Sequence, residues 1–205
     1  MRIGIDFDNT IVGYDEVFAD LARRTGLVDD SFRGGKQALR DTLRRLEGGE
    51  EVWQLLQGRV YGAGMTAAKL IDGVDAFLRH CRSTGEGVLI ISHKTEYGHG
   101  DPERINLRQA ALAWMASQGF FADSGYGLTR ENVFFEATRE EKLARIAALQ
   151  CDVFIDDLDE VLSAPTFPAG VRRILFAQTR NGDDTDLVHC RTWAEIHEAV
   201  FHGSR

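Results

Sequence analysis

The stretch Arg2-Ile-Gly-Ile-Asp-Phe-Asp-Asn-Thr10 decides the fold, because in it a short β-prone run ends directly on a carboxylate. Further short apolar runs follow at 87–91, 132–135, 152–155 and 171–177, and stretches of helical periodicity separate them. Continuous apolar runs that alternate with helices are typical of a parallel sheet covered on both faces. We therefore predict an α/β fold with a doubly wound, Rossmann-like parallel sheet.

The connection between the first two apolar runs is longer than a simple crossover requires. A parallel crossover needs about a dozen residues, whereas this connection extends from residue 7 to residue 86. Apolar stripes at 17–22, 39–46 and 52–56 have the spacing of helix faces, and glycines separate them. We predict a core formed by 1–13 and 67–205, with a small helical insertion formed by 14–66.

Composition narrows the classes of function. The chain has 205 residues and a net charge of -8, which argues against general nucleic-acid binding because that needs a basic surface. No apolar stretch approaches the ~18 residues that span a bilayer, and Asp6 and Asp8 interrupt any signal-peptide pattern. The three cysteines have no disulfide or zinc spacing. We expect a cytoplasmic protein that binds neither nucleic acid nor membrane; the sequence leaves its oligomeric state open.

Two carboxylates stand close together after the first strand. Asp6 and Asp8 repel each other unless a proton or cation lies between them. A hard divalent cation such as Mg²⁺ prefers oxygen ligands and relieves that repulsion. Taken alone, Asp6 and Asp8 could also be two solvent-exposed acids in a loop that bind no cation.

Four motifs in order resemble the haloacid dehalogenase superfamily. Asp6-Phe-Asp-Asn-Thr10 is similar to the first motif, and Ser92 at a strand end is similar to the second. Lys142, early in a helix opened by a capping-box pattern, resembles the third, and Asp156-Asp157 resembles the acidic fourth. The resemblance covers 1–13 and about 70–200 of the chain. It implies the strand order 3-2-1-4-5 and a cap inserted after the first strand.

The resemblance also implies roles for these residues. Asp6 would be the nucleophile that forms an aspartyl-phosphate, and Asp8 would be the general acid and base. Ser92 and Lys142 would bind the transferred phosphoryl group together with Asp6. Mg²⁺ would be held by Asp6, by the backbone carbonyl of Asp8 and by Asp156, while Thr10 and Asp157 would support the site from behind.

These roles predict a magnesium-dependent phosphatase that hydrolyses a small phosphomonoester, such as a phosphosugar or a nucleoside monophosphate. A phosphotransferase or phosphomutase would use the same aspartyl-phosphate with a different acceptor. A catalytically silent binding module with this core is the alternative from a different class. Phosphate release with Mg²⁺ and no acceptor separates the three.

Possible substrate contacts lie in two segments. The residues from 33 to 45 include five cationic side chains and one acidic one. Of these, Arg33, Lys36 and Arg40 could bind a second anionic group of the substrate. The simpler alternative is that these side chains lie on a solvent-exposed face of a helix. His93 and Lys94 follow Ser92 directly in a polar loop. The other histidines, including His80, His197 and His202, show no zinc spacing and are expected to be structural or exposed.

Overall fold

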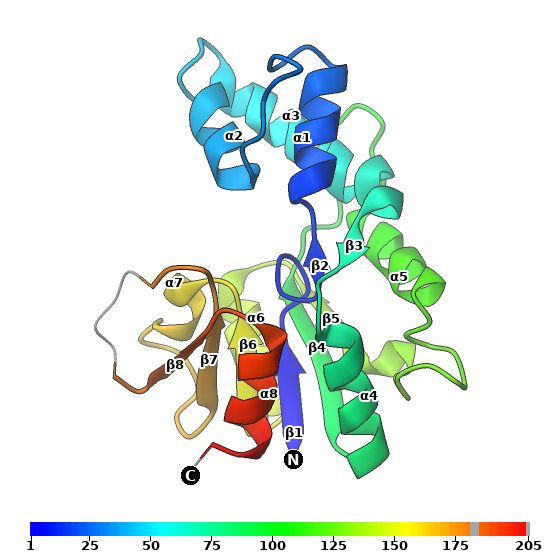
Figure 1. The fold of residues 1–205 in the computed structure, drawn as a ribbon, viewed down its shortest axis with the longest axis vertical. Helices are drawn as coiled ribbons and strands as arrows, with labels where there is room; N and C mark the ends of the chain where they lie inside the picture. The colour runs from blue at the N-terminus through cyan, green and yellow to red at the C-terminus, as the bar shows by residue number, and fades with distance from the viewer. Residues whose placement is uncertain (181–184, 204–205) are drawn as a thin grey trace. The chain divides into compact units, whose positions relative to one another are not determined.

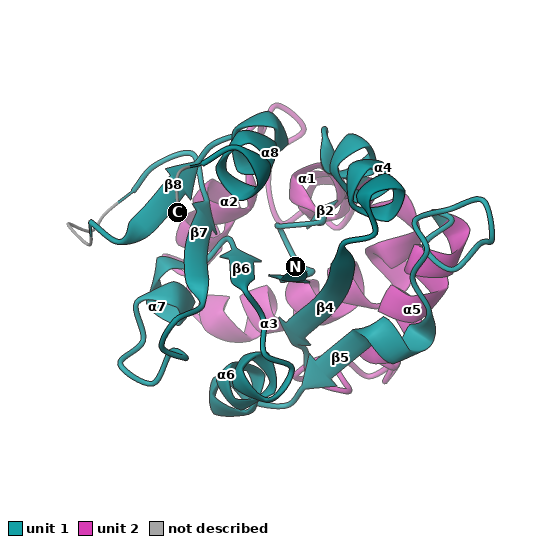
Figure 2. Ribbon diagram, turned by 90° about the horizontal axis from the view of Figure 1, so that it is seen from below, with its two compact units in different colours: residues 1–12, 70–94, 118–205 teal, residues 13–69, 95–117 magenta. Residues whose placement is uncertain are grey.

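The computed structural model describes residues 1–180 and 185–203, and the described chain forms two compact units. Figure 2 colours unit 1 teal and unit 2 magenta. Unit 1 contains Met1–Val12, Leu70–Lys94 and Gln118–Arg205, and unit 2 contains Gly13–Lys69 and Thr95–Ser117. The chain passes from one unit to the other within the short strands β2 (Val12–Gly13) and β3 (Lys69–Leu70), which pair with each other, and again after Lys94 and after Ser117.

Unit 1 is built on a six-stranded parallel sheet (Figure 1). Its spatial order is β5-β4-β1-β6-β7-β8, which extends the predicted order 3-2-1-4-5 by one further strand. The α/β fold class and the parallel sheet predicted from the sequence are therefore confirmed. The strands are β1 (Arg2–Ile5), β4 (Gly87–His93), β5 (Val133–Glu136), β6 (Val153–Asp156), β7 (Arg172–Phe176) and β8 (Leu187–Cys190).

Helices cover both faces of this sheet. Seen from below in Figure 2, α4 and α8 lie on one face and α6 and α7 lie on the other. Their bounds, with the short 3-10 helix η2, are α4 (Val74–Thr84), α6 (Arg139–Ala148), α7 (Asp159–Leu162), α8 (Trp193–Phe201) and η2 (Arg130–Asn132). This double cover explains why Ile3–Ile5 of β1 and Val153–Ile155 of β6 carry no polar side chain before each run meets an aspartate.

The central strand β1 is buried on both faces. Ile3 and Ile5 have no exposed surface, and Ile5 is in register with Ile90 of β4 and Ile155 of β6. Between them lies Gly4, where an added Cβ would stand 2.5 Å from a ring carbon of Phe154. Glycine at this position therefore lets the Phe154 ring pack directly on the strand backbone.

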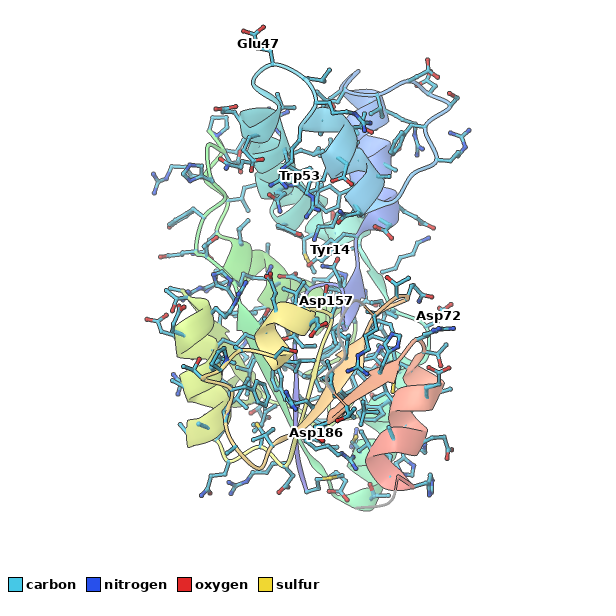
Figure 3. The ribbon with its side chains drawn as sticks, turned by 90° about the vertical axis from the view of Figure 1, so that its left-hand side faces the viewer. Tyr14, Glu47, Trp53, Asp72, Asp157 and Asp186 are labelled. Atoms are coloured by element: carbon cyan, nitrogen blue, oxygen red, sulfur yellow. The ribbon has the colours of Figure 1, made fainter. Side chains whose placement is uncertain are left out.

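Unit 2 is helical, as the apolar stripes predict. It contains α1 (Asp15–Arg24), α2 (Lys36–Leu43), α3 (Gly49–Tyr61), the 3-10 helix η1 (Ala63–Ala67) and α5 (Leu107–Ser117). Aromatic rings fill its interior: Trp53 stacks on Phe18 with ring centroids 5.2 Å apart, and the Tyr14 hydroxyl donates to Met65 Sδ (Figure 3).

The limits of unit 2 differ from those predicted for the cap. The sequence places 14–66 in the cap and assigns everything from 67 onward to the core, whereas 95–117 belong to unit 2. The physical reason is the packing of α5 against α3 and η1, where Trp114 Nε1 donates a hydrogen bond of 2.9 Å to Ala68 O. A buried indole satisfied in this way fixes the helix to unit 2.

Candidate active site

The carboxyl ends of β1, β4 and β6 hold the residues of the candidate site, all within unit 1. Asp6 follows β1 directly, Ser92 is the sixth residue of β4, and Asp156 is the last residue of β6. Ile5 of β1 is in register with Ile155 of β6, and Asp6 N donates to Ile155 O, so the next residues of the two strands, Asp6 and Asp156, lie side by side. Asp6, Ser92 and Asp156 are all at least 95% buried, so the sheet presents polar groups in a dry environment at one edge.

A tight loop after β1 places Asp8 at the same edge. Phe7 O accepts hydrogen bonds from Ile11 N at 3.0 Å and Val12 N at 3.2 Å, which turns the chain back on itself. Asn9 has a φ of 58°, a left-handed conformation that asparagine tolerates better than other residues with a side chain. This conformation explains why an asparagine can stand at this position of the loop.

Lys142 lies between two of the carboxylates. Its Nζ donates to Asp6 Oδ1 and to Asp156 Oδ2, each at 2.6 Å, and its side chain is 2% exposed. Short charge-assisted bonds of this kind are roughly twice as strong as neutral ones. Burial alone would lower the pKa of Lys142, but the carboxylates of Asp156 and Asp6 outweigh burial and raise it, so the ammonium stays charged.

The environment of Asp6 raises its pKa to about 6. Burial is the main cause, because a charged carboxylate is costly in an apolar surrounding, and Asp156 and Asp8 add like-charge repulsion. The positive charge of Lys142 opposes these effects without cancelling them. Asp6 is therefore still ionised at neutral pH, although its charge is poorly stabilised by the surrounding protein.

Helix α6 brings Lys142 to the site because its start is fixed by the predicted capping box. Thr138 Oγ1 accepts from Glu141 N at 3.1 Å, and Glu141 Oε2 accepts from Thr138 N at 3.1 Å. These two bonds satisfy backbone donors that the first turn of a helix leaves unpaired. Lys142 is the residue directly after Glu141, so the cap determines where its side chain begins.

Lys94 makes a contact that the sequence could not predict. Its side chain is 2% exposed, and its Nζ lies 3.0 Å from Asp8 Oδ1 and 2.8 Å from Asp8 Oδ2. The ammonium also lies over the Phe7 ring, 5.6 Å from the ring centroid. Lys94 thus orients the carboxylate of Asp8, whereas the sequence suggested a contact with substrate; that suggestion stays a prediction.

Three carboxylates of the site could share one cation. Oxygens of Asp6, Asp156 and Asp157 lie within 4.8 Å of one another, and Figure 3 labels Asp157. Hard oxygen donors at this spacing fit Mg²⁺. Asp156 Oδ1 also accepts from Leu158 N at 3.0 Å, which fixes the orientation of that carboxylate. Asp157, for which a supporting role is predicted, is thus one of the three residues whose oxygens lie together.

The remaining predicted residues have the following surroundings. Thr10 is fully buried, and its carbonyl accepts from Trp193 Nε1 at 3.1 Å, while its hydroxyl makes no hydrogen bond with the described residues. His93 is exposed and donates from Nε2 to Ala137 O at 3.0 Å. The three cap cations contact groups of their own unit: backbone carbonyls for Arg33, two aromatic rings for Lys36 and Asp41 for Arg40.

Comparison with solved structures identifies the fold. The chain is similar to protein tyrosine kinase A of Mycobacterium tuberculosis, with a TM-score of 0.63 and 16% identity over 98% of this chain and 97% of that one. It is also similar to a haloacid dehalogenase-like hydrolase of Streptococcus pneumoniae, with a TM-score of 0.59 and 13% identity over 95% of each chain. CbbY of Rhodobacter sphaeroides, solved with phosphate, matches with a TM-score of 0.54 and 15% identity over 95% of each chain.

At this level of identity the likeness is one of fold. The chain has the fold of the haloacid dehalogenase-like hydrolases, as the four sequence motifs predict. No model of a protein family matches the sequence, and neither does any curated protein. In the described part of the chain, no helix is both long enough and apolar enough to cross a membrane.

Proposed function

We propose that the protein is a cytoplasmic, magnesium-dependent phosphatase that hydrolyses a small phosphomonoester through an aspartyl-phosphate on Asp6. The observation that carries this proposal is the buried Lys142, whose Nζ lies 2.6 Å from both Asp6 and Asp156. Burying two carboxylates and an ammonium carries a large desolvation penalty, so stability alone does not explain why these charges are in the core. These groups are well suited to receiving an anionic phosphoryl group and neutralising its charge.

In the proposed first step, a carboxylate oxygen of Asp6 attacks phosphorus and the bond from phosphorus to the ester oxygen breaks. The leaving alkoxide takes a proton from Asp8, which the loop 6–12 brings to the same edge as Asp6. Lys142 and Ser92 hold the non-bridging oxygens as charge moves onto them. This step needs an ionised Asp6, and a pKa of about 6 leaves it ionised at neutral pH.

In the second step, a water molecule loses a proton to Asp8 and attacks the phosphorus of the aspartyl-phosphate. The bond from phosphorus to the Asp6 oxygen breaks, which releases inorganic phosphate and restores the carboxylate. The double contact with Lys94 Nζ holds the Asp8 carboxylate in a fixed orientation for this proton transfer. Proton transfer of this kind typically contributes ~10²–10⁴-fold in rate.

Mg²⁺ would be held by Asp6, Asp156 and Asp157, whose oxygens lie close enough to share one ion, with the backbone carbonyl of Asp8 as the remaining predicted ligand. When bound, it supplies charge neutralisation between the nucleophile and the anionic substrate. The fit rests on the chemistry of the donors, because all are hard oxygens.

Transfer of the phosphoryl group to a second substrate is the other candidate. It is favoured by one comparison, because a protein with the same fold and 16% identity is described as a tyrosine kinase. Such an enzyme would share the first step and differ only in the acceptor of the second.

The test is a panel of phosphorylated metabolites incubated with the protein and Mg²⁺, with free phosphate as the readout. Asp6→Asn is the inactive control, and Asp159→Asn, a half-buried acid at the start of α7, is the matched control for loss of an acidic side chain. A phosphatase releases phosphate without an acceptor, and Asp6→Asn or EDTA abolishes the release. Turnover only with an added acceptor supports a transferase, and a folded protein silent in every condition supports a binding module.

A further inference from the structure

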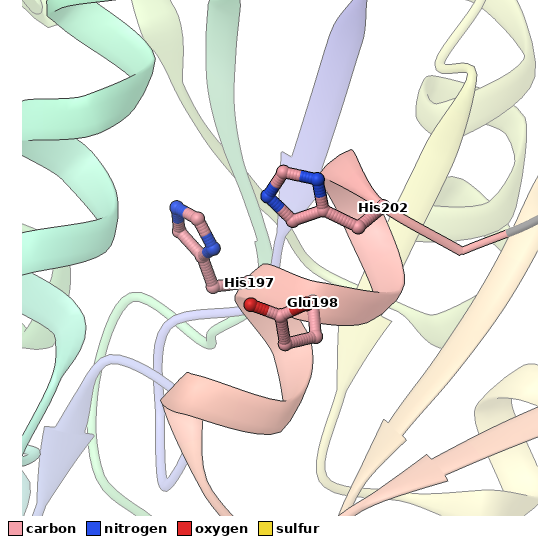
Figure 4. Close-up of side chains that lie close together, drawn as sticks. All are labelled: His197, Glu198 and His202. Carbon is pink, nitrogen blue, oxygen red and sulfur yellow. The ribbon is translucent and has the colours of Figure 1, made fainter.

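A second cluster of metal-binding side chains lies at the C-terminal end of α8, on residues that the proposed phosphatase chemistry does not use. His197, Glu198 and His202 each offer one ligand atom, and these atoms lie within 4.8 Å of one another. Figure 4 shows that the three side chains come from the last turns of this helix. From the sequence, His197 and His202 are expected to be structural or exposed, because their spacing matches no zinc motif.

Helix geometry explains why this unusual spacing still brings the ligands together. Glu198 and His202 are four residues apart and therefore lie on one face of the helix, and the ligand atom of His197 comes within 4.8 Å of theirs. His202 N donates to Glu198 O at 2.9 Å, so the last turn keeps its helical form up to His202. The carbonyl groups at this end of the helix carry partial negative charge, which favours a cation.

The rings around His197 hold it in place. Its centroid lies 4.5 Å from that of His80 on α4 and 4.9 Å from that of Phe201. In the described part of the chain, His197, Glu198 and His202 have no side-chain hydrogen bond or ion pair that a metal would have to break.

We propose that His197, Glu198 and His202 bind one Zn²⁺ ion, with water as the fourth ligand. Two imidazoles and a carboxylate are a donor set that zinc accepts in tetrahedral sites. Nitrogen donors also separate this site from the Asp6, Asp156 and Asp157 cluster, whose oxygens suit Mg²⁺. An ion bound there would hold the last turn of α8 and His202 together.

The test is a Zn²⁺ titration of the full chain against a chromophoric chelator, with millimolar Mg²⁺ present to occupy oxygen-donor sites. His202→Ala and Glu198→Gln change exposed side chains, so both variants are expected to fold, and circular dichroism checks this. The matched control is His99→Ala, because His99 is an exposed histidine outside the cluster. Proton NMR of the histidine ring signals reports which rings bind the ion.

The expected result is one Zn²⁺ per chain, with affinity reduced at least ~10-fold in His202→Ala and Glu198→Gln, since even loss of an outer-shell partner costs that much. His99→Ala should bind as the unchanged protein does, and the ring signals of His197 and His202 should shift together. The proposal is overturned if the cluster variants bind as tightly as His99→Ala. It is equally overturned if the unchanged protein binds Zn²⁺ no more tightly than about 1 mM.

Discussion

Replacing Lys142 by methionine tests whether the site carries the electrostatic strain that the proposed chemistry needs. The substitution keeps most of the side-chain volume and removes the ammonium that lies 2.6 Å from both Asp6 and Asp156. Because all three side chains are at most 6% exposed, water cannot replace the lost partner without rearrangement. Breaking a buried ion pair by removing one partner costs ~3–5 kcal/mol.

For a chain of 205 residues this loss corresponds to a fall in Tm of roughly 6–20 °C. The assay is thermal unfolding followed by circular dichroism, with EDTA present so that no divalent cation compensates. Lys69→Met is the control, because Lys69 forms a salt bridge with Glu16 in which both side chains are more than 70% exposed. Surface pairs of this kind contribute at most ~1 kcal/mol, so the control should shift Tm little.

The loss of stability in Lys142→Met should also grow with pH. The pKa of Asp6 is already raised by burial to about 6, and without Lys142 it should be raised further. A carboxyl group whose folded pKa exceeds its unfolded value of 3.8 favours the folded state at low pH, and this contribution falls as pH rises through the folded pKa. The variant should therefore lie closer to the unchanged protein at pH 5 than at pH 8. Equal Tm values for variant and unchanged protein at pH 8 would refute the reasoning.

Three further predictions follow from single contacts. Lys94→Met should lower kcat about 10–100-fold with little change in KM, because it frees the Asp8 carboxyl that proton transfer uses; a change in KM alone would assign Lys94 to substrate binding. Thr138→Ala should destabilise the protein by ~1 kcal/mol through loss of the α6 cap, measured by urea unfolding, and an unchanged midpoint would contradict this. The thiols of Cys81, Cys151 and Cys190 are buried, and burial raises their pKa to about 11 or 12. A thiol reagent at pH 8 should therefore modify them only after unfolding, and fast reaction in the native protein would contradict this.

The strand ends were predictable because local sequence determines them. Apolar runs that stop on Asp6 or just before Asp156 indicate buried strands whose carboxyl ends face one site, and the register of β1 with β6 agrees. The capping box of α6 was equally readable, because Thr138 and Glu141 are three residues apart. Where a contact depends on neighbours along the chain, the pattern alone predicts it.

Contacts between distant segments were not predictable from one sequence. Lys94 is 86 residues from Asp8, and nothing in either segment indicates that they pair. The helix α5 begins at Leu107, where Asn106 Oδ1 accepts from Gln109 N at 3.0 Å, and its packing in unit 2 depends on segments far from it along the chain. The strand β8 is not predicted from the sequence, because it has only four residues, one of them His189, and polar sequence flanks it.

The most direct test of the central claim is to trap the phosphoryl group on Asp6. In Asp8→Asn, a substrate with a good leaving group such as p-nitrophenyl phosphate should still phosphorylate Asp6, while hydrolysis of the intermediate is slowed ~10²–10⁴-fold by loss of the base. Acid quenching and mass spectrometry of the N-terminal peptide then locate the group. A phosphoryl adduct on Asp6 is expected in Asp8→Asn, and none once Asp6→Asn is added. Turnover by a protein that carries Asp6→Asn, or an adduct elsewhere, would contradict this.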